Sequence, residues 1–579
     1  MEGKAPNPLD TFDHVVVLML ENRSFDNLLG YLYKDGVPEG KKFEGLQTGN
    51  YENPVPERAI DYKSGAKIAP MPTDDYHQPF PDPGEVYQHV NTQLYNTVDA
   101  ENIDVDASKM VAPFNLPNSG VDNPPMNGFV NDYINTLQAL DGTKGEGDWE
   151  KYIKPTKTEY ENIMKCFSPE SVNVLSTLAK EFAVFDHWFC SVPSQTWCNR
   201  AFWHAATSAG YVINPIGEDD EESSKTKAFI DFITWAAKMW NKKDFFGLLH
   251  EKGLKATVYA EQVPLTSLIN GGPTLRYIPN PNFNPGAPDF DPTQVPVLPD
   301  PTDKTNLTYK CGLIGEGLNL GSLKPFLDDV TNNELAPYSF IEPKFIFEHN
   351  DQHPSSVNMS NDLNVFGETR EGTVKLGEKL IWDVYTAIKN SDTYRDNTLL
   401  IITYDEHGGC FDHVPPPKAT PPEAGMVGEK GFKFDRLGVR VPMVMVSSYI
   451  QKNTIVNDVF DHTSFIKTMC KKWGMEGLTD RDKNANSFES VFSDTKRESF
   501  PDIPEPILKK TNVDYSKDPL NDLQKTIVKG AYHAAKLTTQ DKQAIAEIEK
   551  LGQPSKIKTV KGAVKFLKAL QPYIIKGYL

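Results

Sequence analysis

The residues best suited to do chemistry in this sequence stand directly after two apolar runs. Glu21 and Asn22 follow HVVVLML, and Asp405 and Glu406 follow TLLIITY. Adjacent carboxylates repel one another unless a cation lies between them, and hard divalent ions prefer oxygen ligands. If the two runs are neighbouring strands of one sheet, these residues can share one ion. We therefore predict a metal site formed by Glu21, Asn22, Asp405 and Glu406.

Each segment also has a plainer interpretation. Asn22 or Ser24 could cap a helix that begins with SFDNLLGYL, and a carboxylate at a strand end can cap the helix that follows. Alone, the first segment favours the cap, and the second leaves both interpretations open. The two segments together favour the metal site.

A hydroxyl in a third segment is placed to act as a nucleophile. Thr196 in SQTWCNRAFW comes at the start of an apparent helix. A helix N-terminus offers free backbone N–H groups and positive potential, so a phosphate binds there readily and an attacking alkoxide is stabilised. An ordinary threonine at the N-cap of the helix explains the segment equally well and remains open.

The elements that must position these residues alternate between helix and strand. Near-continuous apolar runs predict buried strands, and apolar residues at helical spacing predict the helices between them. We expect strands at 15–20, 183–186, 254–261, 398–406 and 439–448, and helices at 171–182, 244–253, 374–390 and 461–474. This order is typical of an α/β protein with a largely parallel sheet, in which ligands lie at the carboxyl ends of the strands.

The composition favours one large domain with an appendage. The chain has 579 residues, of which 39% are hydrophobic, so it can bury a large core. We predict a main domain over residues 1–500 and a small helical extension over 501–579. Long inserts at 35–160, 217–227 and 279–303 are candidate lids or substrate walls, because loops of this length are usually functional or mobile.

Charge and hydropathy argue against several classes of protein. A formal net charge of −19 disfavours a nucleic-acid-binding protein, which neutralises phosphates with basic surface. The N-terminus lacks the pattern of a Sec signal, and no apolar run is long enough to span a bilayer. We expect a soluble protein that is cytoplasmic or exported by a signal-independent route. The six cysteines contain no CxxC pair and indicate neither a zinc finger nor a disulfide scaffold.

The last 25 residues form a basic amphipathic stretch. Its apolar positions are Val560, Val564, Phe566, Leu567 and Leu570, and five lysines surround them. Such a helix can lie on an anionic membrane surface, which would suit a phospholipid substrate. The plainer interpretation, a helix that docks its apolar stripe on the main domain and leaves its lysines in water, is favoured.

Several motifs resemble those of a known family. ENRSFDNLLG, PSQTWCNRAFW, NDQHPSS, TYDEHGGCFDHVPPP and VRVPMVMVSS with DHTS occur in the order seen in the phosphoesterase family of bacterial, fungal and plant phospholipases C and acid phosphatases. The resemblance covers roughly residues 12–495 and is closest to the bacterial zinc-dependent enzymes that hydrolyse phosphatidylcholine. It implies an alkaline-phosphatase-like α/β sandwich with a compact metal centre.

The resemblance also implies roles for individual residues. Glu21, Asn22, Asp405 and Glu406 match the metal ligands of the family, and Thr196 matches its Ser/Thr nucleophile.

Four further residues complete the implied site. Asn199 and Arg200 would bind the substrate beside the phosphoryl group. His353 is the first choice and His413 the second for the acid that protonates the leaving group.

The sequence departs from the family pattern at two places. Cys198 replaces a proline of the nucleophile motif, and Glu85 follows DPG where some members have a histidine. We assign no role to Glu85 or to the nearby His89. A related sulfatase is disfavoured, because SVPSQ lacks the arginine and CNRAF lacks the proline of the sulfatase motif.

The implied function is a metal-dependent phospholipase C that cleaves glycerophospholipids such as phosphatidylcholine through a phospho-threonine. Zinc is favoured, while calcium and magnesium remain open because the expected ligands are mainly oxygen. An acid-phosphatase-type phosphomonoesterase and a non-catalytic lipid- or phosphate-binding protein are the alternatives. The expected partner is a phospholipid or another phosphate ester, with peripheral membrane contact and oligomeric state left open.

Overall fold

The computed structural model describes residues 7–47, 49–59, 63, 65–142, 157–215, 224–260, 264–271, 277–279, 297–299, 305–311, 323–346, 349–354, 372–508, 520–539 and 542–574. The lids predicted at 217–227 and 279–303 fall largely outside these residues.

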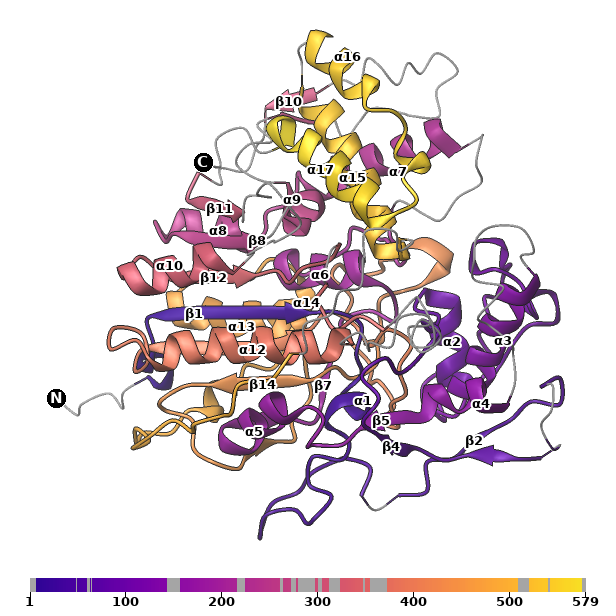
Figure 1. Cartoon of the computed structure of the whole chain (residues 1–579), viewed down its shortest axis with the longest axis horizontal. Helices are drawn as coiled ribbons and strands as arrows, with labels where there is room; N and C mark the ends of the chain where they lie inside the picture. The colour runs from indigo at the N-terminus through magenta and orange to yellow at the C-terminus, as the bar shows by residue number, and fades with distance from the viewer. Residues whose placement is uncertain are drawn as a thin grey trace.

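A central sheet of eight strands runs through the middle of the molecule (Figure 1). In spatial order the strands are β11 (Leu307–Cys311), β8 (Ala256–Ala260), β12 (Tyr338–Ile341), β1 (His14–Leu20), β13 (Thr398–Tyr404), β14 (Met443–Val446), β6 (Ala183–Phe185) and β15 (Thr454–Val456). Of these described strands, β14 alone is antiparallel to its neighbours. The prediction of an α/β protein with a largely parallel central sheet is confirmed.

β1 lies in the interior of the sheet because its residues are apolar on both faces. Residues 15–20 have no exposed surface, and a strand buried on both faces requires such a continuous apolar run. β1 pairs in parallel with β12 on one side and with β13 on the other, and Leu20 lies opposite Tyr404. The residues that follow β1 and β13 therefore meet at one edge of the sheet.

Helices pack beside this sheet in two groups. α5 (Asn173–Glu181) packs against α12 (Thr373–Lys389), while α6 (Thr196–Ala205) packs against α8 (Phe245–Glu251) and α13 (His462–Trp473). These bounds lie within a few residues of the predicted ones.

The helix expected near Ser24 is the short α1 (Phe25–Leu29). Ser24 Oγ accepts a hydrogen bond from the backbone N–H of Asn27 at 3.1 Å. The cap interpretation is thus confirmed for Ser24, and it leaves the Asn22 side chain available for another contact.

The remaining described α-helices are α2 (Tyr87–Tyr95), α3 (Phe129–Gly142), α4 (Lys157–Tyr160), α7 (Ser224–Met239), α9 (Leu265–Asn270), α10 (Lys324–Asn332), α14 (Asp480–Asn484), α15 (Asp522–Thr538), α16 (Lys542–Lys550) and α17 (Val560–Ile574). The short strands outside the central sheet are β2 (Asn53–Pro54), β3 (Lys67–Ile68), β4 (Met71–Thr73), β5 (Lys165–Phe167), β7 (Trp188–Phe189), β9 (Tyr277–Pro279), β10 (Val297–Pro299) and β16 (Phe460–Asp461).

The C-terminal helices pack on the rest of the molecule above the sheet in the view of Figure 1. α15 packs against α7, α9 and α17, and the apolar stripe of α17 is buried in the same hydrophobic cluster as residues of α6 and α7. The lysines of this stretch, Lys556, Lys558, Lys561, Lys565 and Lys568, are exposed. The interpretation of this stretch as a docked helix is therefore confirmed. Within the described residues, none of the helices combines the length and apolarity needed to cross a bilayer.

Candidate functional site

The four predicted metal ligands come together where β1 and β13 end. Because Leu20 lies opposite Tyr404, the next residues of both strands are neighbours. The backbone N–H of Asp405 donates to the Leu20 carbonyl at 3.2 Å, and that of Asn22 donates to Asp405 Oδ1 at 3.2 Å. Glu21, Asn22, Asp405 and Glu406 are all fully buried, so the site is formed by side chains shielded from bulk water.

A close approach of two turns fixes the position of Asn22. Asn22 has a positive φ of 55°, a conformation that asparagine tolerates better than most residues. Gly408, with φ +61°, packs against it so closely that a β-carbon at position 408 would lie 2.3 Å from the Asn22 carbonyl oxygen. Glycine at 408 therefore allows the two strand-end turns to meet.

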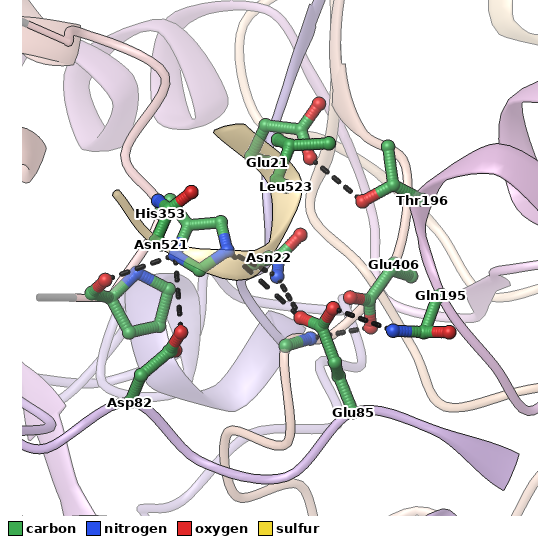
Figure 2. Close-up of polar contacts among 12 residues, drawn as sticks. Glu21, Asn22, Asp82, Glu85, Gln195, Thr196, His353, Glu406, Asn521 and Leu523 are labelled. Atoms are coloured by element: carbon green, nitrogen blue, oxygen red, sulfur yellow. Dashed lines mark hydrogen bonds and ion pairs between the residues drawn. The ribbon is translucent and has the colours of Figure 1, made fainter. Parts of the chain in front are cut away.

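Thr196 faces this group from the start of α6. Its hydroxyl donates to Glu21 Oε2 at 3.1 Å, as Figure 2 shows. Gln195, not Thr196, occupies the N-cap position, and Thr196 is the first helical residue. The structure does not support the ordinary-cap interpretation, and it places the hydroxyl within hydrogen-bond reach of a predicted metal ligand.

Arg200, one turn further along α6, bridges two of the carboxylates. Its Nη2 donates to Glu21 Oε1, and its Nε donates to Asp405 Oδ2 at 3.2 Å. Burial alone would lower the pKa of Arg200, but Glu21 and Asp405 outweigh burial and raise it. The side chain is only 1% exposed. Arg200 thus neutralises buried carboxylates, and its predicted contact with substrate stays a prediction.

The Asn199 side chain is used by the loop before α6. Its Nδ2 donates to the carbonyls of Val192 at 3.2 Å and Ser194 at 2.7 Å, and its Oδ1 accepts from the Val192 N–H at 3.0 Å. In the structure this amide holds the loop that leads to Thr196. The predicted contact between Asn199 and a phosphoryl group stays a prediction.

The buried oxygens of the site suit a cation. Asn22 Oδ1 and Glu406 Oε1 have no hydrogen-bond partner among the described residues, although buried polar atoms are normally paired. Burial, together with the charges of Glu85 and Asp405, raises the pKa of Glu406 well above its usual range. Burial and Asp405 likewise raise the pKa of Glu21 against the opposing effect of Arg200. A divalent ion would satisfy both oxygens and offset this crowding of carboxylates.

His353 is the predicted acid that reaches the site. Its Nε2 lies 2.9 Å from Asn22 Nδ2 and 3.9 Å from Glu85 Oε2, and its Nδ1 lies 2.9 Å from the Pro354 carbonyl (Figure 2). Burial would lower the pKa of His353, but the charges of Asp82, Glu85 and Asp351 raise it to about 9. In this arrangement Nδ1–H donates to Pro354 and Nε2 accepts from the Asn22 amide, while the raised pKa favours uptake of the second proton that a leaving-group acid must give.

His413 belongs to a separate ionic cluster. Its Nδ1 contacts Asp26 Oδ2 at 2.5 Å and its Nε2 contacts Glu44 Oε1 at 3.1 Å. Asp26, Asp412 and His413 place ligand atoms within 4.8 Å of one another, but Arg440 already pairs with both carboxylates at 2.9 Å. This cluster holds the two turns together through Arg440, and both ring nitrogens of His413 are engaged within it.

The structure adds residues that sequence reasoning left without a role. Glu85 contacts Asn22 and also accepts from Gln195 Nε2 at 3.1 Å. His462 Nε2 lies 2.6 Å from the Asp405 carbonyl, which places it against the end of β13. Glu85 had one visible signal, the departure from the family pattern after DPG. For Gln195 and His462, the sequence contains no signal of a role beyond their position inside the family motifs.

Comparison with known proteins covers most of the chain. A model of the phosphoesterase family matches residues 12–476. Non-specific phospholipase C6 of Arabidopsis thaliana is 31% identical over 498 residues, which cover 83% of this chain and 72% of the relative. Phospholipase C A of Mycobacterium tuberculosis is 25% identical over 484 residues, with coverage of 82% and 75%.

Solved structures give weaker matches. The phosphonate monoester hydrolase of Agrobacterium radiobacter is 12% identical with a TM-score of 0.30, and the match covers 57% of this chain and 74% of that one. A protein in the alkaline phosphatase superfamily from Vibrio parahaemolyticus is 13% identical with a TM-score of 0.27, covering 65% and 81%.

Proposed function

Because this chain belongs to the phosphoesterase family and is a phosphoric ester hydrolase, we propose that it is a metal-dependent phospholipase C. The proposed reaction cleaves glycerophospholipids such as phosphatidylcholine to diacylglycerol and a phosphorylated head group. One observation carries the proposal most: the Thr196 hydroxyl lies 3.1 Å from Glu21 Oε2, next to strand-end oxygens that lack partners among the described residues. The curated relatives are themselves named phospholipases C.

The metal would be held by Glu21, Asn22, Asp405 and Glu406, with Thr196 beside them. When bound, a divalent ion supplies positive charge that lowers the pKa of an adjacent hydroxyl and offsets charge on phosphoryl oxygens. Zinc is the favoured ion, and the mainly oxygen donor set also suits calcium or magnesium.

The chain's own residues then carry the chemistry. Glu21 Oε2 accepts a hydrogen bond from the Thr196 hydroxyl and would take its proton as Thr196 Oγ attacks phosphorus to form a phospho-threonine. The N-terminal end of α6 would supply positive potential to the phosphoryl oxygens beside Thr196. His353 gives its proton to the departing diacylglycerol oxygen. Water then attacks phosphorus: His353 takes one proton from the water, and Glu21 returns its proton to Thr196 Oγ as the Thr196 O–P bond breaks and the phosphorylated head group is released.

The substrate and the nucleophile can be tested in one set of assays. Phosphatidylcholine and p-nitrophenyl phosphate are given to the wild type, to Thr196→Ala and to the control Thr177→Ala on α5. Each protein is assayed after treatment with a chelator and after metal is returned.

We expect lipid cleavage that a chelator abolishes and metal restores, and a loss of at least about 1,000-fold in Thr196→Ala, while Thr177→Ala stays active. Release of phosphate from the monoester without cleavage of the lipid would support an acid phosphatase instead. Full activity in Thr196→Ala would overturn the nucleophile, and lipid binding without turnover would point to a non-catalytic protein.

A further inference from the structure

Glu85 connects three groups of the site through one carboxylate. Its Oε2 accepts a hydrogen bond from Asn22 Nδ2, and its Oε1 accepts from Gln195 Nε2 at 3.1 Å. The same Oε2 lies 3.9 Å from His353 Nε2. Figure 2 shows Glu85 reaching toward all three from the segment before α2. Its side chain is 12% exposed, so these contacts are largely shielded from water.

The contact between Glu85 and Asn22 Nδ2, which also lies 2.9 Å from His353 Nε2, favours one orientation of the amide toward the proposed metal. An amide has a donor end and an acceptor end, and only its oxygen binds a cation. Asn22 Nδ2 points at Glu85, and this leaves Oδ1 buried without a hydrogen-bond partner among the described residues. Turning the amide over would place Oδ1 against the carboxylate oxygen of Glu85, where two acceptors repel.

The contact with Gln195 extends this effect to the nucleophile. Gln195 is the N-cap residue of α6 and directly precedes Thr196. Its Nε2 donates to Glu85, while its Oε1 accepts from the Asn214 N–H at 3.1 Å. Both ends of this amide are thus fixed. Glu85 thereby ties the start of α6 to the turn that carries Asn22.

We propose that Glu85 is a positioning residue that orients Asn22 so that its oxygen faces the metal. This proposal rests on the metal site of the proposed function. Partners that hydrogen-bond to a metal ligand fix its orientation, and their loss typically weakens metal binding about 10- to 100-fold. A carboxylate suits this position because it accepts hydrogen bonds and offers no donor that could turn the Asn22 amide.

Asp82 provides a matched control on the same segment. Its carboxylate lies 3.7 Å from His353 Nδ1, on the side of the ring that faces away from Asn22 in Figure 2. Asp82→Asn therefore removes a neighbouring negative charge while the contact between Glu85 and Asn22 is kept. A general effect of charge near the site would appear in both variants, whereas loss of the contact between Glu85 and Asn22 would appear only in the Glu85 variants.

The test measures metal affinity rather than turnover. Dissociation constants for Zn²⁺, and in parallel for Ca²⁺ and Mg²⁺, are obtained by chelator competition for the wild type, Glu85→Ala, Glu85→Gln, Asp82→Asn, Asn22→Ala and the double variant Glu85→Ala/Asn22→Ala. Thermal midpoints without metal show whether each variant folds. We expect Glu85→Ala to bind at least tenfold more weakly and Asp82→Asn to bind as the wild type does. Glu85→Gln, whose amide oxygen can still accept from Asn22, should recover part of the loss.

The double variant separates action through Asn22 from independent action. In the Asn22→Ala background, loss of Glu85 should weaken binding no further, because the group that it orients is gone. An unchanged constant in Glu85→Ala, or losses that add in the double variant, would overturn this role of Glu85 alone. A wild type that binds none of the three ions would overturn the proposed metal site, and this role with it.

Discussion

Single buried charges set the energetics of the site, and Arg200 is the clearest case. It is the cation that bridges Glu21 and Asp405. Removing one partner of a buried ion pair leaves an uncompensated charge and costs about 3–5 kcal/mol. We expect Arg200→Met to lower stability by this amount without metal and to recover part of it when metal is added, because a bound cation can replace the lost charge. Denaturant unfolding with and without Zn²⁺ measures both effects.

The control for this prediction is a surface pair. Arg395 pairs with Asp396 at 3.3 Å and is 41% exposed, and exposed pairs contribute at most about 1 kcal/mol. Arg395→Met should therefore change stability little and should not respond to metal. Equal, metal-independent losses in both variants would contradict the charge-partner role of Arg200.

At the scale of residues, part of the proposed site could be predicted from the residue types that stand directly after the buried strands. Glu21, Asn22, Asp405 and Glu406 could be grouped because each pair directly follows a buried strand, and the two strands together suggest one site at the carboxyl edge of a sheet. The partners of Asn199 and Arg200 could not, because one residue type serves a substrate or a neighbouring side chain equally well. Glu85 lies in an irregular segment, where no periodicity shows which way a side chain points.

At the scale of elements, the two strand-end turns must touch, and Gly408 tests this directly. Ala at 408 would need φ near +61° and would place its β-carbon 2.3 Å from the Asn22 carbonyl oxygen. We expect Gly408→Ala to push the turns apart, weaken metal binding at least about tenfold and lower the thermal midpoint.

Gly425 provides a control, because it also has a left-handed backbone but its position leaves room for a β-carbon. Its φ is +75°, and a β-carbon there would meet nothing within 4 Å. Gly425→Ala should cost about 1–2 kcal/mol from the left-handed backbone alone and leave metal affinity unchanged. If both variants bound metal equally well, the turns would not need their close contact.

The largely parallel sheet and five of its eight strands were predicted, while β11, β12, β15 and the direction of β14 were not. Continuous apolar runs indicate buried strands in either direction, so the antiparallel pairing of β14 with β13 had no signal in its residues. The predicted strand at 439–448 is shorter in the structure, Met443–Val446. Pro442 explains part of this difference, because proline has no N–H to donate to a neighbouring strand.

At the scale of the whole molecule, a buried histidine on α15 makes the stability of the folded protein depend on pH. His533 on α15 lies 6.0 Å from the Phe232 ring on α7, and burial, with the nearby Lys536 and Lys529, lowers its pKa to about 3. The unfolded chain, with a pKa near 6.5, binds more protons than the folded one between these values. Stability is therefore full above pH 6.5 and falls as the pH drops, by roughly 2 kcal/mol between pH 7 and pH 5.

His533→Leu should remove this part of the pH dependence. Thermal midpoints measured from pH 7 to pH 5 should fall less in this variant than in the wild type, while the control His250→Leu on α8 should follow the wild type. If the thermal midpoints of all three proteins fell equally with pH, His533 would not be a source of the pH dependence of stability.

The overall organisation was predicted only in part. The docking of α17 followed from its apolar stripe, but its place in a cluster with α6 and α7 depends on long-range packing that a single sequence does not encode locally. Gln524 on α15 donates to the Phe345 carbonyl at 2.7 Å, and the Phe345 ring lies 5.5 Å from the Arg200 guanidinium. The proposed boundary at residue 500 thus separates segments that contact one another close to Arg200.

The central place of β1 has a consequence for how the protein is made. β1 is the first strand of the sheet to be synthesised, yet its neighbours β12 and β13 begin at Tyr338 and Thr398. At about 5–20 residues per second, roughly 15–60 s of translation pass before β12 leaves the ribosome. During that time a strand whose residues 15–20 are all apolar has neither of its partners. Production of this protein should therefore depend on chaperones that shield residues 14–20 until the later strands arrive.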